Sequence, residues 1–378
     1  MMETTEAVAA QGTLTVTCPR DELTRALGIV SRGVSTRTTV QILGGILLHA
    51  TDGKLELAAT DMELSLRTSI EVQGATEGSV VVPGRLLLDL ARLLPAADVS
   101  IEHKPEEAAV EIRSGSATYR LHTYNAEDFP RLPEAGAAER HEVDRETVLT
   151  TVARVSRSAS RDESRPVLTG VLMRFEPGKL VMAATDSYRL SVKETVVEGT
   201  VPELEAIVPA RALGELARIA QEGEKLDLAV HENQVIFSTG DALLTTRRID
   251  GQFPNYRQLV PEAFDHELAL PREELLDVVR RVSVMAQRNS PLRLRFADGE
   301  LTVSAQTQDV GEARESLPVP FGGEPLEIGF NAEFLRDGIE SVLGDQLRLK
   351  LISPLRPAVL QGEGDDFLYL IMPIRLAG

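Results

Sequence analysis

Aromatic residues and cysteine are both scarce in this chain of 378 residues. There is no tryptophan, and only 4% of the residues are aromatic, which leaves too few rings for a base-stacking platform or an aromatic sugar-binding surface. The only cysteine, Cys18, excludes an internal disulfide and a multi-cysteine metal site. We interpret it as a small buried hydrophobe in a protein of the reducing cytoplasm.

Other signals that would point to a membrane, a metal or an enzyme are missing as well. No run of about 18 apolar residues occurs, so no membrane partner is predicted. Residues 1–13 lack the basic start and apolar run of a signal peptide, and we interpret them as a disordered extension. The six histidines show no metal spacing, and no glycine-rich phosphate motif occurs. We therefore predict no metal, no cofactor, no catalytic residue and no enzymatic activity.

The chain does contain one pattern three times. A strand-then-helix segment starts at Leu14 and recurs at His141 and His266, and the Val-Ser pairs that end these helices are 125 and 127 residues apart. LAATDMELSL recurs as MAATDSYRLS, and VPGRLLLDLARLL recurs as VPARALGELARIA. Several blocks in one order indicate a tandem triplication. The predicted domains are residues 14–139, 140–264 and 265–378.

Each copy is itself double. In the first copy a strand at 14–17 and a helix at 20–33 precede three strand-like runs, and the cycle starts again near Val80 with a helix at 84–94. The predicted fold is α+β, in which each domain is a duplicated βαβββ unit with two helices on antiparallel sheets. Three such domains in a row favour a curved object, which dimerisation through its two ends would close into a ring.

The net charge of −18 is unevenly distributed along the chain. The six predicted helices with their flanking loops carry +5, which leaves −23 on the remainder. If the helices line an inner surface, that surface attracts phosphates while the acidic exterior repels them. Arginine is also a good helix former, which would place basic residues in helices without any role in binding. The triplication favours the lining.

Several segments are similar to the bacterial β sliding clamp, the DNA polymerase III beta subunit family of processivity factors. These segments are VSTRTTVQILGGILL, LAATDMELSL, AATDSYRLSV, IDGQFPNYRQLVP, IGFNAEFL and YLIMPIRL. The resemblance runs in order from about Leu14 to the C-terminus. It implies a head-to-tail homodimeric ring around double-stranded DNA, bound without regard to sequence. DNA polymerases, the clamp loader and repair proteins would then bind through short linear peptides.

The resemblance also implies a peptide groove between the second and third domains. Its lining would be Leu168, Thr185, Ser187, Tyr188, Arg189, Leu190, Pro254, Leu259, Asn331, Phe334, Leu355, Pro357, Met372, Pro373, Ile374 and Arg375. Leu, Met, Pro and Ile at a domain junction form an apolar slot that suits the Leu and Phe anchor residues of a partner peptide, although such residues also form ordinary interdomain core. The chain departs from the family pattern at Ser187 and Tyr188, which replace Gly-His, at Phe334, which replaces Tyr, and at Gln258, which replaces a basic residue.

Two further sets complete the predicted surfaces. The DNA-facing arginines that match the family are Arg37, Arg85, Arg165 and Arg211, to which Arg154 and Arg157 are added from their place on the first helix of the second domain. The predicted dimer contact joins Tyr119 and Leu121 of one subunit to Val284, Met285, Glu312 and Glu315 of the other. Joining two strand edges would cover otherwise exposed backbone groups.

Two alternatives stand beside this interpretation. Asp61 and Asp186 resemble a pair of catalytic carboxylates, but they occupy equivalent positions of two repeats, which favours two turn-forming Thr-Asp pairs. The other alternative is a clamp-like paralogue, for example a drug-tolerant copy, without a main role in replication.

Overall fold

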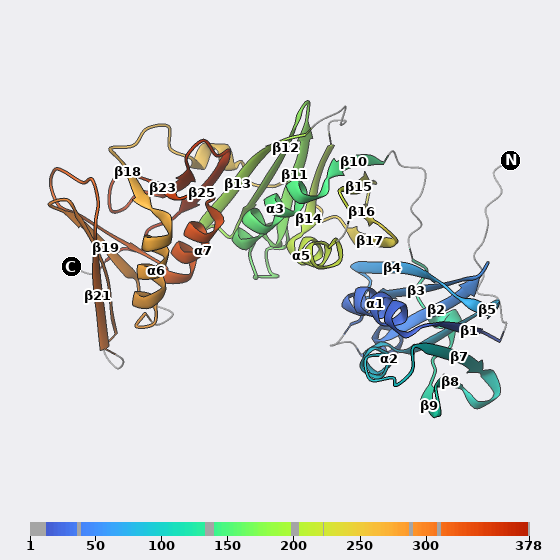
Figure 1. The fold of residues 1–378 in the computed structure, drawn as a ribbon. Coiled ribbons are helices and arrows are strands. Elements are labelled where there is room, and N and C mark those ends of the chain that lie inside the picture. Colours follow the sequence, from blue (N-terminus) through green and yellow to red (C-terminus); the bar gives the residue numbers. More distant parts are fainter. Residues whose placement is uncertain are drawn as a thin grey trace. The chain divides into compact units, whose positions relative to one another are not determined.

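The computed structural model describes residues 13–35, 39–132, 140–197, 204–221, 223–286, 290–307 and 311–376. The expected N-terminal extension, apart from Thr13, and the expected DNA contact Arg37 lie outside these residues. The chain divides into two compact units, which are described one at a time (Figure 1). The first unit comprises Met1–Arg145 with Glu215–Arg248, and the second comprises Glu146–Gly214 with Ile249–Gly378.

The first unit contains the whole first repeat and the closing strands of the second. The first half of the repeat is β1 (Thr15–Pro19), α1 (Arg20–Val30), the short helix η1 (Ser31–Gly33), β2 (Gly45–Thr51), β3 (Lys54–Thr60) and β4 (Leu64–Glu71). After β5 (Gln73–Thr76), the second half is β6 (Gly78–Pro83), α2 (Gly84–Ala91), β7 (Asp98–Lys104), β8 (Ala109–Ser114) and β9 (Ala117–His122). The second repeat adds β10 (His141–Asp144), β15 (Lys225–Val230), β16 (Gln234–Thr239) and β17 (Ala242–Arg247).

The second unit contains the rest of the second repeat and the whole third repeat. From the second repeat come α3 (Arg145–Val155), η5 (Ser156–Ser158), α4 (Pro166–Thr169), β11 (Gly170–Glu176), β12 (Lys179–Thr185), β13 (Arg189–Val196) and β14 (Leu204–Pro209). Helix α5 (Ala210–Ile219) crosses the boundary between the units, and η6 (Tyr256–Leu259) follows. The third repeat is β18 (His266–Pro271), α6 (Arg272–Ser283), β19 (Leu292–Ala297), β20 (Glu300–Thr307), β21 (Gly311–Pro318), β22 (Leu326–Phe330), α7 (Ala332–Ser341), β23 (Gln346–Leu351), β24 (Ala358–Gly362) and β25 (Phe367–Ile371). The doubled βαβββ pattern is therefore confirmed in all three repeats.

Hydrophobic spacing explains why these segments form these elements. Along β4 every second residue from Leu64 to Ile70 is buried, as expected for a strand with one face on a core. In α1 the residues at helical spacing, from Leu23 to Val30, are buried while the polar residues between them are not. Cys18 is buried, as predicted, and burial raises the pKa of its thiol to about 12. No helix among the described residues is long and apolar enough to cross a membrane.

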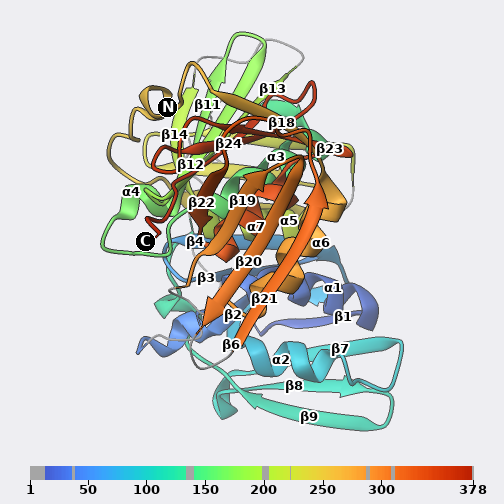
Figure 2. The same ribbon diagram turned by 90° about the vertical axis from the view of Figure 1, so that its left-hand side faces the viewer.

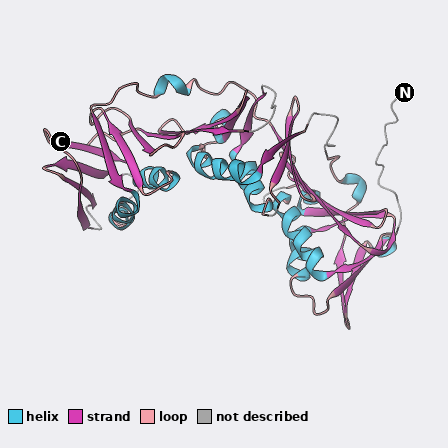
Figure 3. Cartoon of the chain, turned by 45° about the horizontal axis from the view of Figure 1, so that its top comes forward, coloured by secondary structure: helices cyan, strands magenta, loops and turns pink. Residues whose placement is uncertain are grey.

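The sheets connect the repeats in a way that the sequence did not reveal. The strand orders are β5-β1-β7-β8-β9, β10-β15-β16-β17-β4-β3-β2-β6, β14-β11-β12-β13-β25-β24-β23-β18 and β21-β20-β19-β22. The opening strand of one half therefore joins the sheet of the other half, as β1 does beside β7. In each unit the longer helices lie on one side of the strands (Figure 3). Both eight-stranded sheets run from one repeat into the next, through the pairs β4–β17 and β13–β25.

Candidate functional site

The turn that enters β13 is built by a threonine and an aspartate. The Oγ1 of Thr185 donates to the carbonyl of Arg189 over 2.7 Å, and Asp186 Oδ1 accepts from the backbone N–H groups of Tyr188 and Arg189 at 2.9 and 3.0 Å. Ser187 takes a left-handed conformation with φ of +82°. The turn leaves Tyr188 62% exposed.

The same turn precedes β4 in the first repeat. Thr60 Oγ1 donates to the carbonyl of Leu64, and Asp61 Oδ1 accepts from the N–H groups of Glu63 and Leu64. The interpretation of Asp61 and its repeat equivalent as turn formers is confirmed, since both use their carboxylates to satisfy backbone donors.

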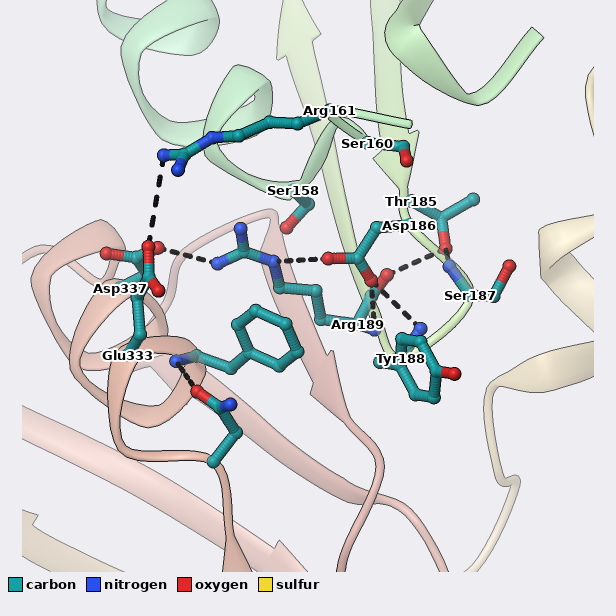
Figure 4. A network of polar contacts seen from close by, with 12 residues as sticks. Ser158, Ser160, Arg161, Thr185, Asp186, Ser187, Tyr188, Arg189, Glu333 and Asp337 are labelled. Atoms are coloured by element: carbon teal, nitrogen blue, oxygen red, sulfur yellow. Dashed lines mark hydrogen bonds and ion pairs between the residues drawn. The ribbon is translucent and has the colours of Figure 1, made fainter. Parts of the chain in front are cut away.

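Arg189 joins the second repeat to the third (Figure 4). The residue is 6% exposed, and its guanidinium donates to Asp186 Oδ2 over 3.0 Å and to Asp337 Oδ2 over 2.6 Å and lies 4.3 Å from the centre of the Phe334 ring. Phe334 and Asp337 both belong to α7. The hydroxyl of Tyr369 on β25, whose pKa is raised by burial, donates to the Phe334 carbonyl. Two carboxylates and a ring therefore hold Arg189 in one orientation.

The predicted groove residues divide into a buried and an exposed set. Leu168, Thr185, Arg189 and Leu190 are buried, so they support the surface from beneath. Tyr188, Leu259, Leu355 and Met372 are large apolar side chains that are at least 40% exposed. Since water-exposed apolar side chains in a group often mark a binding surface, the exposed set is the stronger candidate for peptide contact.

The exposed set lies on segments that connect to one buried cluster of the second unit. The Met372 N–H donates to the Tyr188 carbonyl over 2.8 Å, which fixes the start of the C-terminal segment beside the Thr-Asp turn. Leu259 closes η6, whose Tyr256 packs in a cluster with Leu190 and Leu370. Leu355 stands three residues before Ala358, which pairs with Ile371. Tyr188 and Met372 are therefore joined directly, and Leu259 and Leu355 lie within four residues of cluster members Tyr256 and Val359.

The remaining groove candidates have identifiable local roles. Asn331 Oδ1 accepts from the Phe334 N–H and so caps α7. The Ile374 N–H donates to the Gly329 carbonyl, and a Cβ at Gly329 would lie 2.6 Å from the Leu376 side chain, so glycine lets the C-terminal segment cross β22. Ser187, Pro254 and Arg375 are exposed, and Pro357 and Pro373 are half-buried.

Sequence reasoning missed the acidic partners of this site. Asp337 is 148 residues from Arg189, and no local pattern predicts that the two side chains meet. The available signal was a carboxylate one helical turn after Phe334, which by itself is ordinary on a helix surface. Phe253 and Tyr256, which pack edge to face, were likewise missed as the core beneath the groove candidates.

Arg154 is not a DNA-facing residue, and that prediction was wrong. Its side chain is 5% exposed, its Nε donates to the Ser341 carbonyl over 2.6 Å, and its guanidinium pairs with Asp365 and stacks 4.1 Å from the Phe367 ring centre. Lys193 also pairs with Asp365, and the two cations lower the pKa of this carboxyl although burial opposes them. The face of α3 that carries Arg154 packs against the third repeat.

The other candidate DNA contacts among the described residues, Arg85, Arg157, Arg165 and Arg211, lie on the surface. Arg85 on α2 and Arg211 on α5 are exposed. Arg157 donates to Glu340 over 2.6 Å, and Arg165 pairs with Asp162 and donates to Ser187 Oγ. Part of the helical basic charge is thus already balanced by carboxylates in the chain. The net charge of +5 counted over the predicted helices could not show which arginines pair with carboxylates.

Three tandem domains of this fold, joined by continuous sheets, define a non-catalytic clamp-type accessory protein. Residues 14–133, 142–255 and 257–375 match the N-terminal, central and C-terminal domains of the DNA polymerase III beta subunit. The chain belongs to this family of processivity factors.

Named relatives are similar in sequence to this protein over nearly its whole length. The beta sliding clamp of Synechococcus elongatus is 35% identical, over 95% of this chain and 98% of that protein. The beta sliding clamp homolog GriR of Streptomyces muensis is 31% identical, over 94% and 98%. Among solved structures, the C. crescentus beta sliding clamp, with polyethylene glycol bound to its putative beta-motif tethering region, has a TM-score of 0.91 and 30% identity, and the match covers 97% of this chain and 100% of that one.

Proposed function

We propose that the protein is a replicative sliding clamp of the bacterial cytoplasm, which acts as a head-to-tail homodimeric ring around duplex DNA and tethers DNA polymerases. Its three clamp domains are residues 14–139, 140–264 and 265–378. Topology keeps such a ring on DNA, so its contacts need no base specificity. The membership of the chain in the beta subunit family supports this function.

The proposal that the protein binds partner peptides rests on the exposed apolar residues near the Thr-Asp turn of the second repeat. Tyr188, Leu259, Leu355 and Met372 offer exposed apolar contact area, and the exposed Arg375 adds positive charge. A short linear peptide with apolar anchors and an acidic residue fits this chemistry. Polymerases, the clamp loader and repair proteins are the expected carriers of such peptides.

The DNA-facing part of the proposal retains five of the predicted arginines and omits the buried Arg154. The proposed contacts are Arg37, Arg85, Arg157, Arg165 and Arg211. Contacts from arginine to phosphate give affinity that depends on salt and not on sequence, as sliding requires.

A peptide titration tests the groove. A fluorescent peptide with Leu and Phe anchors, from the replicative polymerase of the same bacterium, is titrated with the full-length protein. We expect Leu355→Asp with Met372→Asp to weaken binding at least about tenfold, because both anchors lose an apolar contact. The matched control is Val196→Asp, which changes another exposed apolar residue, on β13, and should leave affinity unchanged. Equal affinities for all three proteins would refute the groove.

The paralogue alternative rests on the replacements at Ser187 and Tyr188 and on the 31% identity to a protein named as a homolog of the clamp. Primer extension on a long template, with the polymerase and loader of the same bacterium, separates the two candidates. A replicative clamp lengthens the products. A protein that binds the peptide but leaves product length unchanged is a paralogue.

A further inference from the structure

The Thr-Asp turn of the second repeat also forms in the first repeat, where it contains no arginine. The residue 125 positions before Arg189 is Leu64, which is 2% exposed. The N–H of Leu64 donates to Asp61 Oδ1 over 2.9 Å, as the N–H of Arg189 donates to its own aspartate over 3.0 Å. The equivalent residues Met62 and Ser187 have φ values of +78° and +82°. The backbone of the turn therefore does not need the arginine side chain.

The guanidinium of Arg189 pairs with an acid whose position recurs in every repeat. Asp337 is the sixth residue of α7, as Asp89 is of α2 and Glu215 is of α5. Asp89 and Glu215 each pair with the arginine three residues further on, at 3.9 and 2.6 Å. In α7 that residue is Glu340, an acid, and Asp337 instead pairs with Arg189 at 2.6 Å. The link between this acid and the turn is therefore particular to the contact between the second and third repeats.

Helix α7 holds Asp337 in place because it is anchored from beneath. A Cβ at Gly338 would lie 2.6 Å from the Tyr369 ring, so glycine lets the helix pack directly on β25. The Tyr369 hydroxyl donates to the Phe334 carbonyl over 2.7 Å. On its other sides α7 adjoins α3 and α6 through hydrogen bonds and ion pairs (Figures 1 and 2). Asp337 is thus a fixed point of the third repeat.

The turn that Arg189 belongs to carries two of the exposed groove candidates. Tyr188 is 62% exposed, and its carbonyl accepts from the Met372 N–H over 2.8 Å. Asp186 accepts the N–H groups of Tyr188 and Arg189 with Oδ1, and the Nε of Arg189 with Oδ2. A displacement of Arg189 is therefore passed to Tyr188 and Met372 through hydrogen bonds.

The guanidinium of Arg189 is already occupied and has no group left for a peptide. It donates to Asp186 and Asp337, and the Phe334 ring lies against it (Figure 4). An acidic residue of a peptide would have to displace one of these carboxylates from a residue that is only 6% exposed. The contribution of Arg189 to peptide binding is therefore to hold the turn. Since ordering a loop on binding lowers affinity, a turn that is held beforehand raises it.

We propose that Asp337 is a positioning residue of the peptide groove. Through Arg189 it holds the Thr-Asp turn of the second repeat against the third, so that Tyr188 and Met372 are in place before a peptide arrives. This inference rests on the proposed peptide-binding function, and it assigns to that function a residue outside the predicted groove lining.

Peptide affinity is the first test, with the fluorescent polymerase peptide and the full-length protein. Asp337→Asn keeps the size of the side chain and removes its charge, and it should weaken binding about tenfold because a looser turn must be ordered on binding. The matched control is Glu340→Gln, which changes a similarly exposed acid of α7 that pairs with Arg157 and Arg280. This control should bind within about twofold of the original protein.

A double variant tests whether Asp337 acts through Arg189. Arg189→Leu introduces the residue of the first repeat and should weaken binding by a similar factor. Adding Asp337→Asn to Arg189→Leu should weaken binding no further, because the acid then has no arginine to hold. Two independent losses would instead multiply to about a hundredfold.

Hydrogen exchange separates positioning from a general loss of stability. In Asp337→Asn without peptide, the N–H groups of Tyr188 and Arg189 should exchange at least about tenfold faster than in the original protein. The amides of β23, in the same unit, should keep their rates, because positioning acts on the turn whereas a general loss of stability acts on the whole unit.

The outcomes distinguish this inference from the proposed function. If the original protein binds the peptide and Asp337→Asn binds equally well with unchanged exchange, the groove stands and the positioning role is wrong. The role is also wrong if Glu340→Gln weakens binding as much, if the two losses multiply, or if β23 exchanges faster as well. If the original protein does not bind the peptide, the proposed groove fails and the inference fails with it.

Discussion

The Thr-Asp turns of the first and second repeats have one backbone and two different surroundings. In the first, the Arg247 N–H donates to the Glu63 carbonyl over 3.0 Å, and in the second the Met372 N–H donates to the Tyr188 carbonyl over 2.8 Å. The two bonds occupy equivalent places, 125 residues apart. The first joint between repeats is the strand pair β4–β17, and the second is β13–β25. Charged residues stand at this place in the first joint, and apolar residues stand there in the second.

The residue that ends each turn differs in the same sense. Leu64 is buried and completes the core beneath its sheet, whereas Arg189 reaches across to Asp337 of the next repeat. The turn itself is thus a property of the fold that the repeats share. The candidate function of the second turn comes from what the third repeat brings to it, namely Asp337, Phe334 and Met372.

The largest expected effect concerns Arg189. Replacing Arg189 by Met leaves Asp186 and Asp337 mostly buried beside each other without their cation, and we expect the second unit to lose about 3–5 kcal/mol of unfolding free energy. Urea denaturation measures the loss. Arg247→Met, at an exposed position of the first joint, is the control and should cost less than about 1 kcal/mol. Similar losses for both would show that the two joints do not differ in this way.

Exchanging the surface residues of the two joints is the next test. Tyr188→Glu with Met372→Arg gives the second joint the charged pair of the first, and peptide affinity should fall about 100-fold because two apolar anchoring contacts are removed. Both side chains are exposed, so the melting temperature should stay within a few degrees. Calorimetric titration checks the affinity. Retained binding would move the peptide site away from the Thr-Asp turn.

Local features of this fold could be predicted from the sequence, and long-range ones could not. The duplicated βαβββ order follows from alternation and turn signals close together in the chain, such as the alternating buried residues of β4. The pairing of β1 with β7, which places β1 in the sheet of the other half, could not be predicted from the sequence of either strand. Arg154 illustrates the limit at the level of a site, since an arginine on a helix looks basic and exposed until Asp365, 211 residues away, is seen to pair with it.

The buried ion cluster around Asp365 predicts that the stability of the second unit depends on pH. The pKa of Asp365 is lowered in the folded protein, so its contribution to stability is present above the unfolded pKa, about 3.9, and is lost as the pH falls through the lower folded value. Asp365→Asn should lower the unfolding free energy by about 2 kcal/mol at pH 7, and by progressively less as the pH falls below about 3.9. Thermal unfolding over a series of pH values measures this. A difference that persists unchanged in acid would exclude the ionised carboxylate as its source.

The smallest effect is expected from the exposed arginines of α2 and α5, in contrast to buried Arg154. Arg85→Glu with Arg211→Glu should shorten retention on nicked circular DNA severalfold and should make the salt dependence of binding shallower, by about one unit of slope for each lost phosphate contact. Dimer mass and peptide affinity serve as controls. Arg165 is unsuitable for this test, because its guanidinium donates to Ser187 Oγ and its loss would disturb the groove candidates as well. An unchanged salt slope would show that these two side chains do not meet phosphates, and the basic helix surface would then have to be sought on other residues.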